Sequence, residues 1–426
     1  MAKLTKFQII VLAIFSIGIL IGLGSLALVK NNGGAATADP VVIWGVWSKS
    51  TFDSFLAVLN NDRSTPLPIT YVQKEQSAFE KDLTEDLALG NGPDAILVPQ
   101  EMLLTFENKL ITIPYTSFTA RDFKDSFIEQ AELYLRNDGI VGVPFAIDPM
   151  VMYWNRDTFT SAGLATYPKI WDDYVDLTKK LNQKDVNANI RKSAVALGEF
   201  ANISNARDIF SLILLQSGNP ITSNKESILG GPGIEMTSRS LSFFNTFSNP
   251  SSPAYSWNRS LPLSRNFFLS GNLATYFGYA SEISDLREKN PNLNYDVAPM
   301  PQPKDAKIKV NYGRMYGFSI VKSTKNSANT LATIFELTTP TSQNTLVSQT
   351  YLPPVRRDLI AQGNSDPYLA IFYNAALISK GWLDPDPYVT ARLFQNLSES
   401  VTSGRANMTQ AIDDAHTELD ILLQKR

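Results

Sequence analysis

A single carboxylate interrupts the most apolar stretch in the middle of the chain. Asp148 follows one apolar, strand-favouring run, Ile140–Ala146, and precedes a second one, Val151–Trp154. An aspartate buried between two such strands is costly unless another group pairs with it. Two interpretations stay open at this point: protein groups satisfy Asp148, or it is kept to accept hydrogen bonds from a ligand.

A second acid could act together with Asp148 on a sugar. Glu101 follows the strand predicted at residues 95–98, and glycoside hydrolysis needs two carboxylates at a set separation. A carbohydrate-active enzyme in which Asp148 and Glu101 face each other is therefore one hypothesis. Cysteine–histidine catalysis is excluded because the chain has no cysteine, and no G-x-S-x-G motif is present.

Aromatic and polar side chains also follow each of the first three predicted strands. In a parallel sheet covered by helices, ligands lie beyond the carboxyl ends of the strands. The residues that this rule selects as ligand contacts are Trp47, Gln76, Gln100 and Glu101.

A tryptophan stands in a polar loop later in the chain. Trp257 lies within Asn249–Pro262, a segment rich in proline and serine. An indole in such a loop either covers local core or serves as a stacking surface for a ligand ring. Both alternatives stay open for Trp257.

The elements that must position these residues alternate between strand and helix. Strands are predicted at residues 41–46, 69–72 and 95–98, and the segments between them repeat apolar residues at helical spacing. Parallel strands need crossover connections of this kind, so the pattern predicts an α/β fold with a mainly parallel sheet flanked by helices. Further along the chain, Ala206–Gln216 is predicted to be a core helix.

The composition is that of an ordinary globular protein with material for two domains. The 426 residues carry a net charge of −3, with 44% hydrophobic and 19% charged residues, so nothing favours a nucleic-acid partner. With no cysteine and one histidine, His416, a metal site built from these residues is not expected. No cofactor is predicted.

The first 30 residues predict a membrane anchor. Phe7–Val29 is apolar over about the length of a membrane-spanning helix, and Lys3 and Lys6 precede it. Residues 1–30 are thus expected to be a single-pass signal anchor with the N-terminus inside, followed by a linker at residues 31–40. A cleaved signal peptide is the alternative, because Ala36–Ala38 offers a small-residue cleavage site.

Residues 138–173 carry a set of short motifs. They are DGIVGVP, the acid at 148, Y-x-N-x-D-x-F from Tyr153, A-G-L from Ala162 and P-x-x-W-D-D from Pro168. This arrangement resembles the extracellular solute-binding proteins of ABC transporters (family 1, sugar-binding), the family that includes maltose-binding protein. The chain departs from the family pattern at Trp154, where tyrosine is usual, and at Ile170, where threonine is usual.

The resemblance implies roles for further residues. Glu101 falls at the position of an acidic residue that contacts the sugar in maltose-binding protein. Asp148 precedes Trp154 by the same interval that separates the cleft carboxylate from the strand tyrosine in that protein. Tyr279 follows a segment like the family's F-x-x-G-x-x-A and would lie against the sugar. We expect Asp148, Trp257 and Tyr279 to form the centre of the ligand site. Gly313 and Arg314, in a strand like the one that re-enters the first lobe, would lie close to the cleft.

The same resemblance implies a two-lobe, periplasmic-binding-protein-like fold of type II. The N-terminal lobe would comprise residues 41–147 and 298–346, and the C-terminal lobe residues 148–297 and 347–426, with crossings near Ile147, Val297 and Leu346. The chain would be a non-enzymatic, membrane-tethered extracellular (or periplasmic) protein that captures a small solute and delivers it to ABC permease subunits. The solute expected from the resemblance is a sugar or oligosaccharide. A ligand sensor that serves no transporter stays open as an alternative.

Overall fold

The structure is a computed structural model that describes residues 39–61 and 63–426. The predicted anchor at residues 1–30 and most of the predicted linker lie outside this range. Within it, no helix combines the length and apolar character that a membrane crossing requires. Residues Val41–Arg426 form one compact unit.

Strands of very different length make up the sheets. Their bounds are β1 (Val41–Gly45), β2 (Ile69–Gln73), β3 (Ala95–Pro99), β4 (Ile113–Pro114), β5 (Leu135–Arg136), β6 (Gly139–Ile140), β7 (Val143–Asn155), β8 (Gln183–Lys184), β9 (Ile190–Val195), β10 (Thr222–Ser223), β11 (Glu226–Ser227), β12 (Leu273–Tyr279), β13 (Tyr295–Ala298), β14 (Asn311–Ile320) and β15 (Ser379–Lys380).

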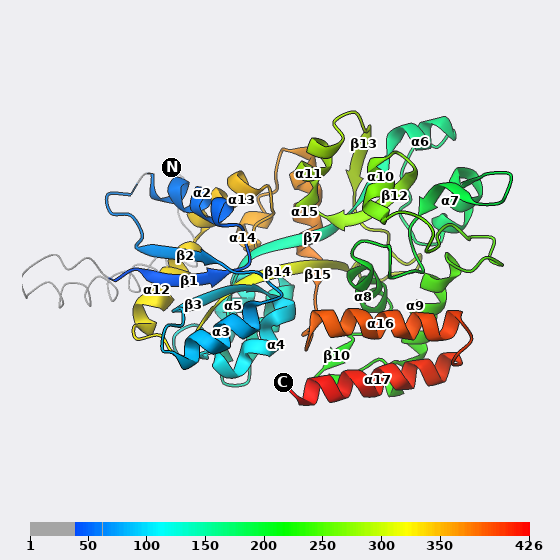
Figure 1. The fold of residues 1–426 in the computed structure, drawn as a ribbon. Coiled ribbons are helices and arrows are strands. Elements are labelled where there is room, and N and C mark those ends of the chain that lie inside the picture. Colours follow the sequence, from blue (N-terminus) through cyan, green and yellow to red (C-terminus); the bar gives the residue numbers. More distant parts are fainter. Residues whose placement is uncertain (1–38, 62) are drawn as a thin grey trace, which may run out of the picture. The chain divides into compact units, whose positions relative to one another are not determined.

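The helices surround these strands (Figure 1). Their bounds are α2 (Lys49–Asn60), α3 (Phe79–Ala88), α4 (Leu103–Phe106), α5 (Ala120–Ser126), α6 (Arg156–Ser161), α7 (Asp173–Leu181), α8 (Ala206–Gln216), α9 (Ile234–Thr246), α10 (Ser264–Leu269), α11 (Glu282–Lys289), α12 (Ser327–Leu337), α13 (Pro340–Thr350), α14 (Arg357–Ile360), α15 (Pro367–Leu377), α16 (Pro387–Thr402) and α17 (Met408–Gln424), with 3₁₀ turns η1 (Gln100–Met102), η2 (Glu107–Lys109), η3 (Glu129–Tyr134) and η4 (Gly231–Gly233).

One sheet runs through the whole unit. Its strand order is β2-β1-β3-β14-β7-β12-β9-β8, with β13 paired to β7 and β15 paired to β14. β1 is parallel to both β2 and β3, and α2 and α3 lie on opposite sides of these strands in Figure 1. The strand and helix alternation predicted for the start of the chain is confirmed. We call the part built on β1–β3 the N-terminal lobe and the part built on β8, β9 and β12 the C-terminal lobe.

A single strand, β7, belongs to both lobes. Its first half pairs with β14 as far as Pro149, and its second half pairs with β12 from Met150 onward. The predicted break at Ile147–Pro149 is therefore wrong. Pro149 has no N–H to donate, and it stands where the strand changes partners, so a continuous strand tolerates it there.

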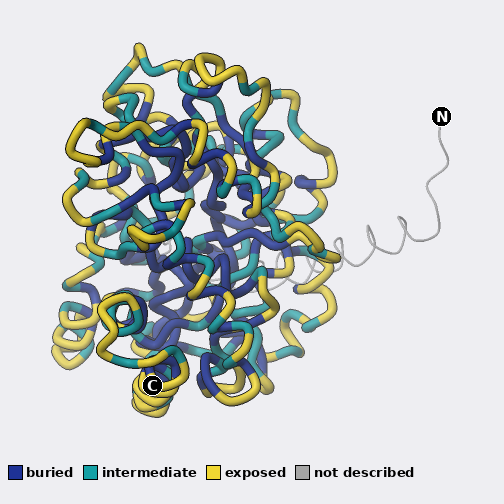
Figure 2. Tube along the Cα trace, turned by 90° about the vertical axis from the view of Figure 1, so that its right-hand side faces the viewer, coloured by how far each residue is buried: buried dark blue, intermediate teal, exposed yellow. Residues whose placement is uncertain are grey.

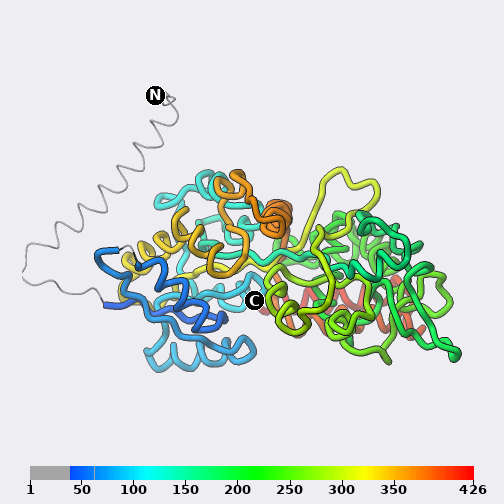
Figure 3. Tube along the Cα trace, turned by 90° about the horizontal axis from the view of Figure 1, so that it is seen from above, coloured from blue at the N-terminus to red at the C-terminus, as the bar shows by residue number. Residues whose placement is uncertain are grey.

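The later helices divide between the lobes. α13 packs on α2, and Arg356, just before α14, bridges to Phe127 of the N-terminal lobe. α15 contacts β7, β13 and β14, and it lies between the two lobes when the chain is seen from above (Figure 3). We therefore propose that the third crossing lies at α15, later than the predicted Leu346; the other lobe limits stay predictions.

Local sequence explains how several helices begin. Asp366 and Asp386 each precede a proline at the first helical position, and each carboxylate accepts hydrogen bonds from the next two main-chain N–H groups. Proline suits that position because its missing N–H would be unpaired there anyway. These two D-P-Y sequences therefore set where α15 and α16 begin.

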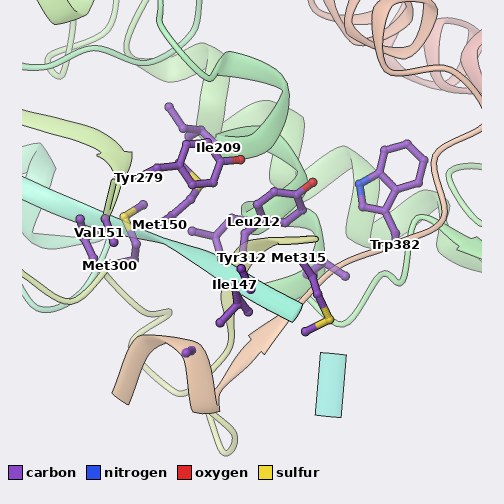
Figure 4. Close-up of a cluster of buried hydrophobic side chains, with 14 of the residues drawn as sticks. Ile147, Met150, Val151, Ile209, Leu212, Tyr279, Met300, Tyr312, Met315 and Trp382 are labelled. Atoms are coloured by element: carbon purple, nitrogen blue, oxygen red, sulfur yellow. The ribbon is translucent and has the colours of Figure 1, made fainter. Parts of the chain in front are cut away.

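Buried residues, dark blue in Figure 2, run through the interior of the unit. They belong to both lobes and to β7 and β14, the strands that join them. At the junction, apolar residues of β7 and β14 pack with residues of α8. Figure 4 shows this cluster, in which Ile147 and Met315 lie near Leu212, and Tyr279 lies near Ile209. A packed junction of this kind supports the polar residues described next.

Candidate functional site

One face of β14 gathers side chains from several elements. Tyr312, Arg314 and Tyr316 alternate along the strand and therefore share a face. Asp148 of β7 is the register partner of Arg314. Trp47, which follows β1, is partly buried, and its ring centroid lies 5.5 Å from that of Tyr316. Three of the predicted site residues therefore converge at the junction of the lobes.

Arg314 links the two lobes through its guanidinium group. Its Nε donates to Glu101 Oε1 at 2.9 Å, and its Nη2 donates to Asp208 Oδ2 at 3.2 Å. The guanidinium carbon lies 4.5 Å from the ring centroid of Tyr279, whose hydroxyl donates to Asp208 Oδ2 at 2.6 Å. Glu101, Tyr279 and Arg314, all predicted, thus meet around Asp208, which was not.

A second arginine extends this charged cluster. Arg207 donates from Nε to Asp208 Oδ1 at 2.8 Å and from Nη1 to Asp384 Oδ2 at 3.0 Å. Its Nη2 lies 3.6 Å from Glu101 Oε1. Asp384 also accepts hydrogen bonds at Oδ1 from the Thr390 hydroxyl and the Asp386 N–H. We call the five residues Glu101, Arg207, Asp208, Arg314 and Asp384 the junction cluster.

The junction cluster is almost completely withdrawn from solvent. Glu101, Asp208 and Asp384 are at most 3% exposed, whereas the Arg314 side chain keeps 27% of its surface accessible. Burial acts to raise the pKa of Asp208, but Arg207 and Arg314 more than offset it, so that pKa lies below its usual value. Burial raises the pKa of Asp384 to about 7, although Arg207 opposes the shift.

One acceptor in the cluster has no partner. Glu101 Oε2 is buried and accepts no hydrogen bond from the residues that the structure describes. A buried carboxylate oxygen without a donor is costly, so it is an available acceptor for a hydroxyl group.

Asp148 is satisfied by protein groups. Its Oδ1 accepts from the Ser281 N–H at 3.0 Å, and its Oδ2 accepts from the Ser281 hydroxyl at 2.6 Å. Burial raises its pKa to about 6, while these two bonds and Arg314 oppose the shift. The first interpretation of the sequence, internal pairing, is the one this geometry favours.

Two other predicted contacts have structural roles. Gln100 donates to the Gly313 carbonyl at 3.1 Å and accepts from the Met315 N–H at 3.0 Å, which fixes β14 beside η1. Gly313 is needed for close packing, because a Cβ there would lie 2.9 Å from Ile147 Cδ1 and 3.0 Å from Ser379 Oγ. Both residues therefore hold β14 in its position at the junction.

The remaining predicted residues do not join the cluster. Trp257 is fully buried in the C-terminal lobe, where its indole donates to Asn202 Oδ1 at 2.9 Å and packs on Phe267. This is the core alternative, and the structure does not present Trp257 as a stacking surface. Gln76 is half-buried in the turn before α3.

Sequence reasoning missed Arg207, Asp208 and Asp384. A signal was present for the first two, since α8 reads ARDIFSLILLQ and places adjacent opposite charges at the head of an otherwise apolar helix. Because charged residues are seldom fully buried unless paired, this pattern could have marked a buried ion-pair site. Asp384 lies in the segment Asp384–Pro387, whose prolines suggest only a helix start.

The cluster can bind polar groups but holds no arrangement for metal chemistry. Among residues 39–61 and 63–426, no set of three His, Cys, Asp or Glu side chains is placed to hold a metal ion. A separate polar cavity of 410 Å³ lies in the C-terminal lobe, lined by residues that include Asn155, Lys180 and Asn294. We place the candidate site at the junction cluster instead, because buried charges of both lobes converge there.

Comparison with known sequences gives a family match and distant relatives. A sequence model described as bacterial extracellular solute-binding protein matches residues 61–370. A binding protein of Brucella abortus (strain 2308) is 24% identical over 157 residues, which are 37% of this chain and 38% of that protein. A binding protein of Brucella suis biovar 1 (strain 1330) gives the same values. The chain thus spans well under half the length of these curated relatives.

Solved structures match nearly the whole chain. The cyclic α-maltosyl-1,6-maltose binding protein of Arthrobacter globiformis has a TM-score of 0.73 at 15% identity, covering 91% of this chain and 99% of that chain. CpMnBP1 with bound mannobiose gives 0.68 at 19% identity, covering 89% and 99%. UgpB of Mycobacterium tuberculosis with glycerophosphocholine gives 0.69 at 16% identity, covering 91% and 99%. The predicted two-lobe, periplasmic-binding-protein-like α/β fold is confirmed by these matches, and the matched proteins are binding proteins.

Proposed function

The chain belongs to the bacterial extracellular solute-binding proteins, and from this membership we propose that it captures a sugar or oligosaccharide between its lobes for an ABC permease. One observation carries the proposal: Glu101, with a free buried acceptor oxygen, stands at the junction beside Arg314 and Tyr279. Acceptors for hydroxyl groups next to aromatic surface suit a neutral sugar.

The solved relatives support this choice of ligand class. One carries mannobiose, and another is a maltosyl-maltose binding protein. The Mycobacterium tuberculosis protein carries glycerophosphocholine, so the fold also accommodates a solute that is not a sugar. For this chain we favour carbohydrate, because the junction offers the partly exposed rings of Trp47 and Tyr316 near the carboxylates.

The proposed mechanism is hinge closure. A ligand that contacts both lobes stabilises the closed form by its differential contacts, and a permease distinguishes that form from the open one. β7, β14 and α15 connect the lobes and would carry the hinge. In this proposal Glu101, Asp208 and Arg314 contact ligand hydroxyl groups, while Gln100 and Gly313 hold β14 in place.

We also propose that residues 1–30 tether the protein to the cytoplasmic membrane with the binding lobes outside. The apolar run Phe7–Val29 and the preceding lysines support this orientation. A sensor without a transporter would have the same tether and the same site; the presence of permease genes beside this gene would favour transport.

An enzyme that uses Asp148 and Glu101 is less well supported. Asp148 is occupied by Ser281, and Glu101 is paired with Arg314. Neither carboxylate is arranged as a free general acid, and the matched family consists of binding proteins.

A thermal-shift screen tests the ligand class. The full-length protein, in a detergent without a sugar head group, is screened against mannobiose, maltose, maltotetraose, glycerophosphocholine, polyols and dipeptides. Because binding to the native state raises its apparent stability, at least one saccharide should raise the melting temperature. Stabilisation by dipeptides or by glycerophosphocholine alone would contradict a carbohydrate function.

Calorimetry with a site variant then tests the location. Glu101→Gln keeps the shape and removes the charge, so the affinity for the saccharide found in the screen should fall by about 1.5–3 kcal/mol. Asp305→Asn makes the same chemical change in an exposed loop and serves as the matched control. Equal affinities for wild type and Glu101→Gln would remove Glu101 from the site.

A further inference from the structure

The junction cluster joins the lobes through the protein's own charges. Glu101 follows β3 of the N-terminal lobe, and Arg207 and Asp208 lie at the start of α8 of the C-terminal lobe. Arg207 Nη2 lies 3.6 Å from Glu101, and Arg314 of β14 donates to Asp208 at 3.2 Å. Arg207 therefore makes an ion-pair contact across the junction, and Arg314, on a strand that connects the lobes, makes a second one with the C-terminal lobe.

Charge balance makes Arg207 the central member. It is 8% exposed and holds Asp208 and Asp384 within its own lobe while reaching Glu101 in the other. Without it, Glu101 and Asp208 would share Arg314, and Asp384 would lose its arginine partner. Removing one partner from a buried ion pair is strongly destabilising, because the charge left behind stays out of water.

Opening the lobes would relieve such an imbalance. Separated lobes hydrate Glu101 and Asp208, so the closed arrangement is favoured only while the arginines neutralise the carboxylates. Burial raises the pKa of Asp384 to about 7, so part of its charge is absent near neutral pH, which brings the closed cluster closer to balance.

We propose that Arg207 is a latch residue that holds the two lobes together in the ligand-free protein by pairing with Glu101 across the junction while it neutralises Asp208 and Asp384. The inference rests on the proposed hinge but on no particular ligand. An incoming solute then has to replace contacts that the protein already makes with itself. The strength of the Arg207 contacts therefore sets how far the observed ligand affinity falls below that of a site without them.

The absence of cysteine allows a direct measurement of lobe separation. Cysteines placed at Leu89 and Val186, which are 71% and 100% exposed, put one spin label on each lobe of the full-length protein. Double electron–electron resonance without ligand should give a narrow distance distribution for the otherwise wild-type chain. In Arg207→Gln the distribution should shift to longer distances.

Three further variants separate the latch from general damage. Arg265→Gln removes an arginine whose partners, Glu282 and Asp285, lie in the same lobe, so the distances should stay unchanged. Asp384→Asn alone should also leave them unchanged, because Arg207 keeps Glu101 and Asp208. Arg207→Gln combined with Asp384→Asn removes one charge of each sign and should move the distribution back toward that of the wild type.

The outcomes are decisive in both directions. An unchanged distribution in Arg207→Gln, or equal opening in Asp384→Asn and Arg265→Gln, would overturn the latch, with circular dichroism confirming that each variant is folded. Because no ligand is added, failure to find a saccharide in the screen would contradict the proposed function but would not change the distances measured for the Arg207 variants. Conversely, an unchanged Arg207→Gln would leave sugar capture standing.

Discussion

Both carboxylate oxygens of Asp148 accept hydrogen bonds, yet ionisation of this buried group still affects the stability of the protein. Ser281 supplies an N–H and a hydroxyl to the carboxylate from the start of α11. Burial nevertheless raises its pKa from 3.8 to about 6. The folded protein therefore holds this proton more tightly than the unfolded chain does, and ionisation of Asp148 costs stability.

We predict that Asp148→Asn removes this cost. The stability that Asp148 contributes is present below about pH 4 and is lost as the pH rises through about 6, because its folded pKa lies above the unfolded value. An amide stays neutral throughout. The free energy of unfolding of Asp148→Asn, relative to wild type, should thus rise by about 2–3 kcal/mol between pH 4 and pH 7.

Urea titrations at unit pH steps measure this difference. Asp305→Asn, in an exposed loop, should show no comparable trend. A difference between Asp148→Asn and wild type that is independent of pH would show that Asp148 is already ionised at pH 4 in the folded protein.

For individual residues, the sequence identified several members of the candidate site but not the side chains that they contact. Glu101, Tyr279 and Arg314 were predicted and do meet, because strand ends and family motifs locate them. Trp257 was predicted to contact the ligand but is fully buried, and its partner Asn202 lies 55 positions earlier, beyond any local pattern. Arg207 and Asp208 were taken as part of a core helix because the apolar residues of α8 dominate its sequence.

The strand β14 depends on a glutamine that the sequence had suggested as a ligand contact. Gln100 bonds to the carbonyl of Gly313 and to the N–H of Met315, and it is 1% exposed. Gln76, predicted by the same rule about strand ends, is half-buried in a turn. The two glutamines therefore form a matched pair of variants with different expected outcomes.

We predict that Gln100→Ala destabilises the protein by about 1–3 kcal/mol, because it leaves the buried Met315 N–H without an acceptor. Gln76→Ala should change stability by less than about 0.5 kcal/mol, as surface substitutions usually do. Chemical denaturation of both variants checks this. Equal stability of the two would mean that solvent or another side chain takes over the bonds of Gln100.

The predicted boundaries of helices and strands agree with the structure where local sequence alone defines the element. The strand at 95–98 and the helix Ala206–Gln216 agree with β3 and α8, because periodic apolar residues and flanking turns define them locally. β7 was predicted as two strands because Asp148 and Pro149 break its apolar run. Its continuity depends on β14 and β12, which are far away in the sequence and which local patterns cannot identify.

At the scale of the whole molecule, the N-terminal segment is proposed to hold the lobes at the membrane. We predict that Met1–Val29 stays attached in the mature protein, because its apolar run has the length of a membrane span and lysines at the inner end. Mass spectrometry of the native protein from its membrane fraction should detect the intact N-terminus. A mature chain that starts at Asp39 would instead indicate a cleaved signal peptide.

The continuity of β7 limits how this protein can be cut and recombined. One uninterrupted strand pairs with β14 and then with β12, so the sheet in each lobe is incomplete without β7. A hybrid that joins one lobe to that of a relative must therefore exchange segments at Pro149, where the strand changes neighbours, and not at the loops on either side.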